Sequence, residues 1–196
     1  IAGVAAALSV REGRALKWNA AGLAFSTAYL AWSAAAQQHV TSIAQESLRE
    51  QGKQAQHLLV TPTAFNTVLW RIVAITPEGY EEGFHSLLDR ERNIRFDLFP
   101  RGEALYERLR GDWHVNRIAW FSHGFFKMDE REGQARISDL RMGQEPAYTF
   151  SFVVAERQSE SFAPVTPVLV GRRPDLDRAL PWLWRRMWGE QIAPPR

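Results

Sequence analysis

Hydrophobic and polar positions divide the chain into a long uncharged run near its start and a remainder in which apolar and polar positions alternate. The uncharged run covers the 28 residues from Trp18 to Gln45 and is rich in alanine. A membrane-spanning helix requires about 20 mostly apolar residues, and a glycine stop follows at Gly52. The pattern therefore predicts a transmembrane helix with a water-exposed extension over residues 15–52.

The same run has a second interpretation, which is a long alanine-rich helix of a soluble protein or of a helical bundle. Strongly apolar side chains are sparse in it, and polar residues such as Asn19, Gln37 and His39 dilute them. Small residues such as Gly22 and Ser26 permit close packing between membrane helices, which would account for the weak hydropathy. The residue pattern alone leaves both interpretations open.

Residues 1–14 are interpreted as the end of a preceding membrane helix and a basic loop, because the apolar residues 1–10 precede Arg11 and Arg14. The chain begins with Ile1, which suggests a fragment that lacks its N-terminal portion. The positive-inside rule assigns a basic loop between two membrane helices to the cytoplasm. On that assignment, the globular domain lies on the other side of the membrane, in a periplasm.

Residues 53–172 are predicted to form a mainly antiparallel α+β domain with about five to seven strands. Val, Ile and Trp favour a strand over 67–76, and the Pro-Glu-Gly sequence predicts a turn into a partner strand at 80–89. Other strands are expected at 93–99, 117–130, 134–143 and 147–157, and a short helix at 102–111. In the last of these strands, alternation predicts one face made of Tyr148, Phe150, Phe152 and Val154.

The C-terminal residues 173–196 are predicted to form an amphipathic helix and a tail, because leucines recur there at helical spacing. Three tryptophans accompany Arg185 and Arg186 on this helix. Aromatic and basic side chains together are typical of a membrane interface. The alternative is a helix that covers the sheet with one face and keeps its arginines in water.

The composition excludes several classes of function. After residue 45, basic and acidic residues are equal in number, with 21 of each. A nucleic-acid partner is therefore not expected, because it would require a concentrated basic surface. The chain has no cysteine, which excludes disulfides, cysteine-ligated zinc and thiol nucleophiles.

Arg71 is a candidate site residue because it occurs in an otherwise apolar strand, on the same face as Leu69 and Val73. A buried arginine needs a carboxylate partner, and an Arg71–Asp139 ion pair would hold two strands together. Asp139 also shares a strand face with Arg141, so it could instead orient arginines toward an anionic ligand. The candidate ligand-binding residues are therefore Arg71, Asp139 and Arg141.

Candidate catalytic residues are His85, Asp89 and His123, which could meet across strands around a metal. None of the five histidines forms the close pair on one element that is typical of metal sites. Polar surface or half-buried histidines are the competing interpretation, and no metal site is assigned to this chain.

Three segments resemble one bacterial family: TPTAFNTVLWRIVAITPEGYEEGFHSLLD (61–89), RIAWFSHGFFKM (117–128) and ISDLRMGQEPAYTFSFVVAER (137–157). They are similar to the C-terminal half of YdjM-like inner-membrane proteins, which are commonly described as membrane-bound metal-dependent hydrolases. The resemblance implies an N-terminal membrane region with metal-binding histidine motifs, for which this chain has no counterpart. It also implies a bacterial inner-membrane location, membrane lipid as a partner, and a divalent metal cofactor only in the full-length protein.

The leading hypothesis is that the chain is the C-terminal portion of such a protein, and that any metal-dependent hydrolysis belongs to the missing N-terminal region. The globular domain would then regulate, gate or present a substrate such as a lipid or an envelope component. A second hypothesis is a non-enzymatic, membrane-anchored interaction or ligand-binding domain. A third is a self-sufficient hydrolase that acts through His85, Asp89 and His123.

Overall fold

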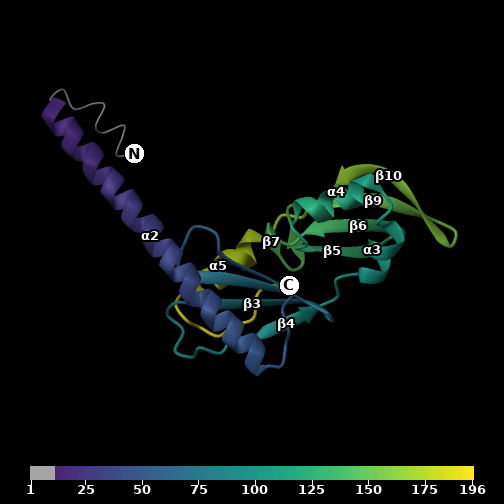
Figure 1. Ribbon diagram of the computed structural model, residues 1–196, viewed down its shortest axis with the longest axis horizontal. Coiled ribbons are helices and arrows are strands. Elements are labelled where there is room, and N and C mark those ends of the chain that lie inside the picture. The colour runs from purple at the N-terminus through teal and green to yellow at the C-terminus, as the bar shows by residue number, and fades with distance from the viewer. Residues whose placement is uncertain (1–11) are drawn as a thin grey trace.

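The computed structural model describes residues 12–196, and its longest element is the helix α2 (Glu12–Glu50) (Figure 1). With a rise of 1.5 Å per residue, its 39 residues extend over about 58 Å. The helix ends where the sequence predicts, because Gly52 adopts a left-handed φ of 70° just after it. The expected end of a preceding membrane helix, residues 1–10, falls outside the described residues. The expected basic loop is partly helical, since α2 already begins at Glu12.

Four antiparallel strands form the lower sheet in the order β1-β2-β3-β4. They are β1 (His57–Pro62), β2 (Leu69–Thr76), β3 (Gly79–Ser86) and β4 (Phe96–Phe99). The predicted turn connects β2 to β3, whose end residues Thr76 and Gly79 face each other. Gly79 is required there, because a Cβ atom would overlap the carbonyl oxygen of Phe99.

The lower sheet has two differently covered faces, which follow from the alternation of side chains along β2. Trp70, Ile72 and Ala74 pack beneath the second half of α2, in a cluster with Val40 and Ile43 of the helix. The opposite face carries the odd-numbered residues of β2, including the predicted group of Leu69, Arg71 and Val73. Because α2 seals the first face, any site on β2 that other elements can reach lies on the second.

A second antiparallel sheet has the strand order β10-β9-β6-β5 and lies beside the lower sheet (Figure 1). Its strands are β5 (Phe126–Arg131), β6 (Gln134–Asp139), β9 (Ser151–Gln158) and β10 (Ser161–Leu169). Two short helices cover it, α3 (Glu103–Leu109) and α4 (Trp113–Phe121). A small hairpin of β7 (Gly143–Gln144) and β8 (Ala147–Tyr148) connects β6 to β9. The architecture confirms an α+β fold with a long N-terminal helix and antiparallel sheets.

One predicted strand is wrong, because residues 117–121 belong to the helix α4. Asp112 caps this helix, and its side chain accepts hydrogen bonds from the backbone N–H groups of His114 and Val115. Val115 and Ala119 are buried one helical turn apart against the second sheet. The strand character of the sequence begins only at Phe126.

The C-terminal helix α5 (Leu176–Met187) packs on one end of the lower sheet. Its Trp182 contacts Phe84 of β3 edge to face, with the ring centroids 4.9 Å apart. The interpretation that this helix covers the sheet is correct, but its arginines do not all lie in water. Arg186 is buried and pairs with Asp89.

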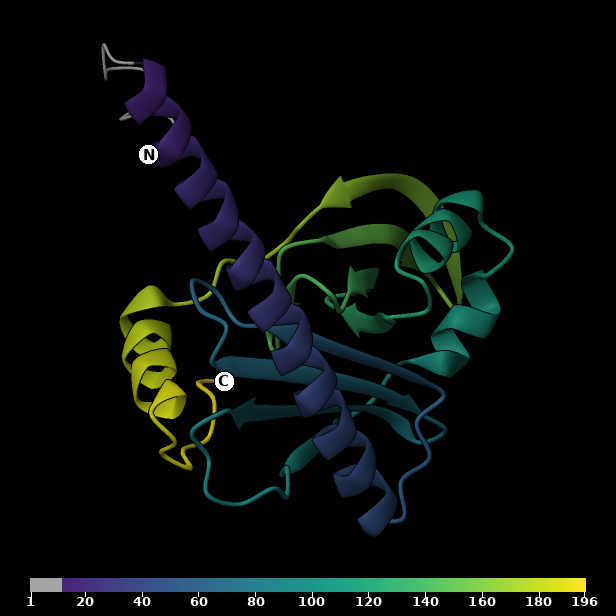
Figure 2. The same ribbon diagram turned by 60° about the vertical axis from the view of Figure 1, so that its left-hand side comes forward.

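The first half of α2 makes no comparable contact and projects away from both sheets (Figures 1 and 2). Its large apolar side chains are exposed, namely those of Leu16, Trp18, Leu23, Phe25, Tyr29, Leu30 and Trp32. Within residues 12–196, no helix combines the length and the apolar character that crossing a membrane demands.

Candidate functional site

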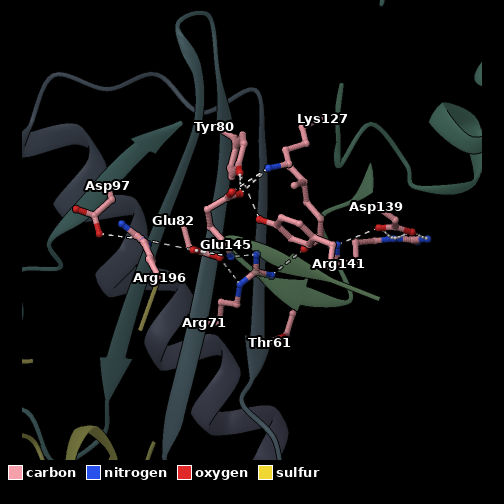
Figure 3. A network of polar contacts seen from close by, with 12 residues as sticks. Thr61, Arg71, Tyr80, Glu82, Asp97, Lys127, Asp139, Arg141, Glu145 and Arg196 are labelled. Carbon is pink, nitrogen blue, oxygen red and sulfur yellow. Dashed lines mark hydrogen bonds and ion pairs between the residues drawn. The ribbon is translucent and has the colours of Figure 1, made fainter. Parts of the chain in front are cut away.

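The candidate site begins with Arg71, which is only 5% exposed in the middle of β2. Its Nε donates a hydrogen bond of 2.7 Å to Glu82 Oε1, and its Nη2 lies 2.6 Å from the same oxygen (Figure 3). Its Nη1 donates to the backbone oxygen of Leu140 at 2.8 Å. The predicted Arg71–Asp139 ion pair is therefore wrong. Glu82 takes that place because β3 pairs Glu82 with Val73, which makes Glu82 a diagonal neighbour of Arg71.

Asp139 instead holds Arg141, as its position two residues away on one face suggested. The Asp139 carboxylate accepts hydrogen bonds from Arg141 Nε at 3.0 Å and Nη2 at 2.7 Å. It also accepts one from the backbone N–H of Arg141. These hydrogen bonds raise the pKa of Arg141 above its ordinary value, although partial burial acts against them. The guanidinium also lies over the ring of Phe121, so Arg141 is held in one orientation.

The structure thus brings all three candidate ligand-binding residues together. Arg71 donates to Leu140, which lies between Asp139 and Arg141 in the chain (Figure 3). Through this hydrogen bond, the segment that follows β6 contacts the face of the lower sheet that carries Arg71. Arg71 belongs to β2 and Arg141 follows the end of β6, and a carboxylate holds each of them.

A second part of the network, centred on Glu145 in the turn between β7 and β8, was not predicted from the sequence. Lys127 Nζ donates to both carboxylate oxygens of Glu145, at 2.7 and 3.0 Å. Tyr80 donates its hydroxyl to the same carboxylate at 2.5 Å, and the Tyr148 hydroxyl lies 3.3 Å from that of Tyr80. The backbone N–H of Glu145 donates to Glu82, which joins this part of the network to Arg71.

Burial and hydrogen bonding fix the protonation states in this network. Burial strongly raises the pKa of both Tyr80 and Tyr148, so both phenols stay protonated at neutral pH. Burial alone would also raise the pKa of Glu145, but the hydrogen bonds from Lys127 and Tyr80 lower it below the ordinary value. Glu145 is therefore ionised, and its negative charge pairs with Lys127 within the network.

A cavity of about 410 Å³ opens beside the two arginines. It lies among β1, the β1–β2 loop, the β7–β8 hairpin and α5, and both Arg71 and Arg141 line it. Most of its other lining is apolar and includes Pro62, Phe65, Leu180, Trp182 and Leu183. Its volume falls in the range of ligand pockets, about 300–1,000 Å³. An apolar cavity with a few convergent polar groups is the usual form of a small-molecule site.

The candidate catalytic residues are only partly brought together. Arg186 binds both carboxylate oxygens of Asp89, at 2.6 and 2.7 Å, and also donates to the backbone oxygen of Phe84. His85 Nδ1 lies 3.4 Å from Asp89, and burial lowers the pKa of His85 even though Asp89 acts to raise it. His123 is exposed in the turn after α4. Among residues 12–196, no group of three or more His, Cys, Asp or Glu side chains could hold a metal ion.

The contacts of Asp89 indicate a structural role for this cluster. The Asp89–Arg186 pair is buried and connects the end of β3 to α5. The Ser86 hydroxyl makes a second link by donating to the backbone oxygen of Met187 at 2.6 Å. These polar contacts hold α5 in position, and α5 in turn forms one wall of the cavity.

Comparisons of the chain with protein-family models, with curated proteins and with solved structures return no match. Two features stand out, namely the exposed, uncharged half of α2 and the arginine-lined cavity.

Proposed function

We propose that this chain is a membrane-anchored, non-enzymatic ligand-binding or interaction domain on the periplasmic side of a bacterial inner membrane. The observation that carries the proposal is the projecting half of α2, residues 16–35. Its large apolar side chains are exposed, and the half-helix itself projects away from both sheets (Figure 2). Our proposal is that a lipid bilayer surrounds this half-helix.

Exposure of this segment to water is unfavourable. Exposed helices are ordinarily polar on their outer side and are supported by pairs of opposite charge. The segment from Trp18 onward has no charge with which to form such pairs. Twenty helical residues extend over about 30 Å, which equals the thickness of the hydrocarbon core of a bilayer.

The modest hydropathy of the segment agrees with a position beside other membrane helices. Alanine, glycine and serine dominate it, and Gly22 and Ser26 lie four residues apart, on one face of the helix. Small residues at this spacing allow two helix backbones to approach closely in lipid. The basic residues Arg11, Arg14 and Lys17 lie before the uncharged part of the segment in the sequence. By the positive-inside rule they would face the cytoplasm, which gives the folded domain its periplasmic side.

The resemblance to YdjM-like proteins supports the same location and adds metal-dependent hydrolysis as a prediction. That chemistry would belong to a membrane region outside the residues of this chain. The third hypothesis, hydrolysis by His85, Asp89 and His123, has no support from the geometry. Arg186 binds both carboxylate oxygens of Asp89, and His123 lies apart in an exposed turn. The geometry of this domain supports binding better than catalysis.

Fractionation of bacterial cells that express the chain tests the proposal. The chain should remain with the membranes after a wash at high salt and alkaline pH, and detergent should release it. Replacing Leu23 and Phe25 together with Asp should move the chain to the soluble fraction, because charges within a bilayer are costly. Leu98→Asp, at an exposed apolar position of β4, is the matched control and should leave the chain in the membrane. A wild-type chain that is soluble and monodisperse without detergent would contradict the proposal.

A further inference from the structure

We propose that the cavity beside Arg71 and Arg141 binds a single-chain amphiphile with an anionic headgroup, which it takes from the membrane surface. The inference deepens the proposed function and rests on it for the source of the ligand. Three features carry it: the arginines at one end of the cavity, the apolar wall, and the place of the cavity relative to α2.

The arginine end of the cavity provides an unused hydrogen-bond donor. Arg71 lines the cavity, but its Nη2 is buried and lies 2.6 Å from Glu82 Oε1, so this nitrogen is engaged within the protein. Asp139 engages Nε and Nη2 of Arg141, whereas Nη1 of Arg141 has no hydrogen-bond partner within residues 12–196. A guanidinium group matches the oxygen geometry of phosphate and carboxylate groups. An anionic headgroup beside Arg141 would satisfy the donor that the protein leaves open.

The apolar wall provides a surface for a hydrocarbon chain. Leu176 and Leu180 of α5 line the cavity, and about half or more of each side chain is exposed. Phe65, at the tip of the β1–β2 loop, is 97% exposed and also lines the cavity. Exposed apolar side chains around one cavity mark a binding surface more often than scattered single ones. A hydrocarbon chain that covers them would gain about 0.8 kcal/mol for each buried methylene.

The β1–β2 loop holds Phe65 outward by a specific local structure. Phe65 has a φ of 64°, a left-handed conformation that is unfavourable for a bulky residue. Asn66 maintains it, since its side-chain oxygen accepts hydrogen bonds from the backbone N–H groups of Val68 and Leu69, at 2.9 and 2.7 Å. Its side-chain nitrogen donates to Thr63 at 2.8 Å. Backbone strain that keeps an aromatic ring in water suggests that the ring serves a binding partner.

The place of the cavity indicates the source of its ligand. In both ribbon views, α5 and the β1–β2 loop lie at the end of the lower sheet toward which α2 projects (Figures 1 and 2). If the projecting half of α2 lies in a bilayer, the walls of the cavity lie next to its surface. An amphiphile could then move from the bilayer to the cavity without its hydrocarbon chain crossing much water. A free inorganic anion would leave the apolar wall uncovered, and a neutral amphiphile would leave the Arg141 donor unpaired.

Native mass spectrometry of the full chain, released from neutral detergent micelles, tests the inference with dodecyl phosphate as the probe. One dodecyl phosphate should bind per chain. Arg141→Gln should weaken binding about tenfold or more, because a charge-assisted hydrogen bond contributes about 1.5–3 kcal/mol. Leu180→Asp should also weaken binding, because it places a negative charge in the apolar wall. Arg178→Gln removes an exposed arginine of α5 that does not line the cavity, and should have no effect.

Three results would overturn the inference: equal binding to the wild type and to Arg141→Gln, equally tight binding of inorganic phosphate, or equally tight binding of the uncharged dodecyl maltoside. Circular dichroism of each variant shows that a loss of binding is not a loss of fold. Membrane retention is measured separately in the fractionation experiment. A chain that stays in the membrane but binds no dodecyl phosphate contradicts only this inference. A soluble chain that binds it contradicts the anchoring proposal and the membrane source of the ligand, but not the binding site.

Discussion

The two halves of α2 belong to one continuous helix but have opposite surroundings. In the second half, Ala36, Val40, Ile43, Ala44 and Leu48 are buried against the lower sheet. In the first half, side chains of equal or greater size are exposed. Helices in water gain most of their stability from packing one apolar face, so the second half is stable because of the sheet. The first half needs a different partner, and the proposed bilayer would be that partner.

The comparison separates residues that stabilise the domain from residues that determine its location. Substitutions in the docked half, residues 36–50, should lower the free energy of unfolding and leave membrane binding of the folded fraction unchanged. Substitutions in the projecting half, residues 16–35, should weaken membrane binding and leave the free energy of unfolding unchanged.

Ile43→Asp should have the largest effect. The side chain of Ile43 is 1% exposed between α2 and the lower sheet, and an unpaired carboxylate there would have no solvent and no partner. We expect a loss of more than about 4 kcal/mol in the free energy of unfolding, measured by urea denaturation in neutral detergent. Phe25→Asp, in the projecting half, should change this value by less than about 0.5 kcal/mol. Equal losses in the two variants would show that both halves of the helix stabilise the fold.

Leu48→Ala should lower the free energy of unfolding by about 2–5 kcal/mol, because it leaves a cavity in the apolar cluster under α2. Leu23→Ala is the matched control, since it removes the same atoms from an exposed position. Its effect on urea unfolding should stay within about 0.5 kcal/mol. If Leu23→Ala were as destabilising as Leu48→Ala, the projecting half would have a partner within the folded domain.

Ser47→Ala tests a polar contact of the docked half. The Ser47 hydroxyl accepts a hydrogen bond of 3.0 Å from the backbone N–H of Ile94 and donates to the backbone oxygen of Arg92. Removing it leaves a buried N–H group without a partner, at a cost of about 1–3 kcal/mol. Ser26→Ala in the projecting half should be neutral in the same unfolding experiment. A neutral Ser47→Ala would mean that this hydrogen bond does not hold the 90–94 loop to α2.

His85 should make the stability of the docked half depend on pH. It lies opposite Trp70, on the sheet face that α2 covers. Burial lowers its pKa below the ordinary value of 6.5, and the charges of Arg186, His39 and Arg92 act in the same direction against Asp89. Below about pH 6.5, His85 therefore binds a proton more readily in the unfolded chain than in the folded chain. The free energy of unfolding then falls as the pH falls.

Urea denaturation between pH 5 and pH 8 measures this slope. His85→Gln should flatten it, whereas His123→Gln, at the exposed histidine, should leave it unchanged. A slope that survives in His85→Gln would assign the pH dependence to another group.

The sequence predicted the elements whose signals are local. The length of α2 follows from an uninterrupted helical sequence and the glycine after it, and the faces of β2 and β3 follow from alternation. The Asp139–Arg141 contact could also be predicted, because the partners are two positions apart on one face. The α4 helix was missed because Ile118, Trp120 and Phe121 favour strands, although Asp112 before it is a typical N-cap.

The rest of the site depends on contacts between distant segments. The sequence does not show which carboxylate pairs with Arg71. The register of β2 against β3 brings Glu82, and not Asp139, next to it. The Lys127–Glu145 pair joins β5 to a turn whose position depends on packing between the sheets. The strand β10 was missed because Pro164 and Pro167 argue against a strand, yet β10 is an edge strand, where proline is tolerated.

The central claim, that lipid surrounds the projecting half of α2, has one most direct test. The chain has no cysteine, so single-cysteine variants report on single positions. Ala24→Cys and Gln45→Cys both place a thiol at an exposed position of the same helix, one in each half. In liposomes, a membrane-impermeant maleimide should label Cys at position 45 and should label position 24 only after detergent is added. Rapid labelling of both positions in intact liposomes would contradict the account.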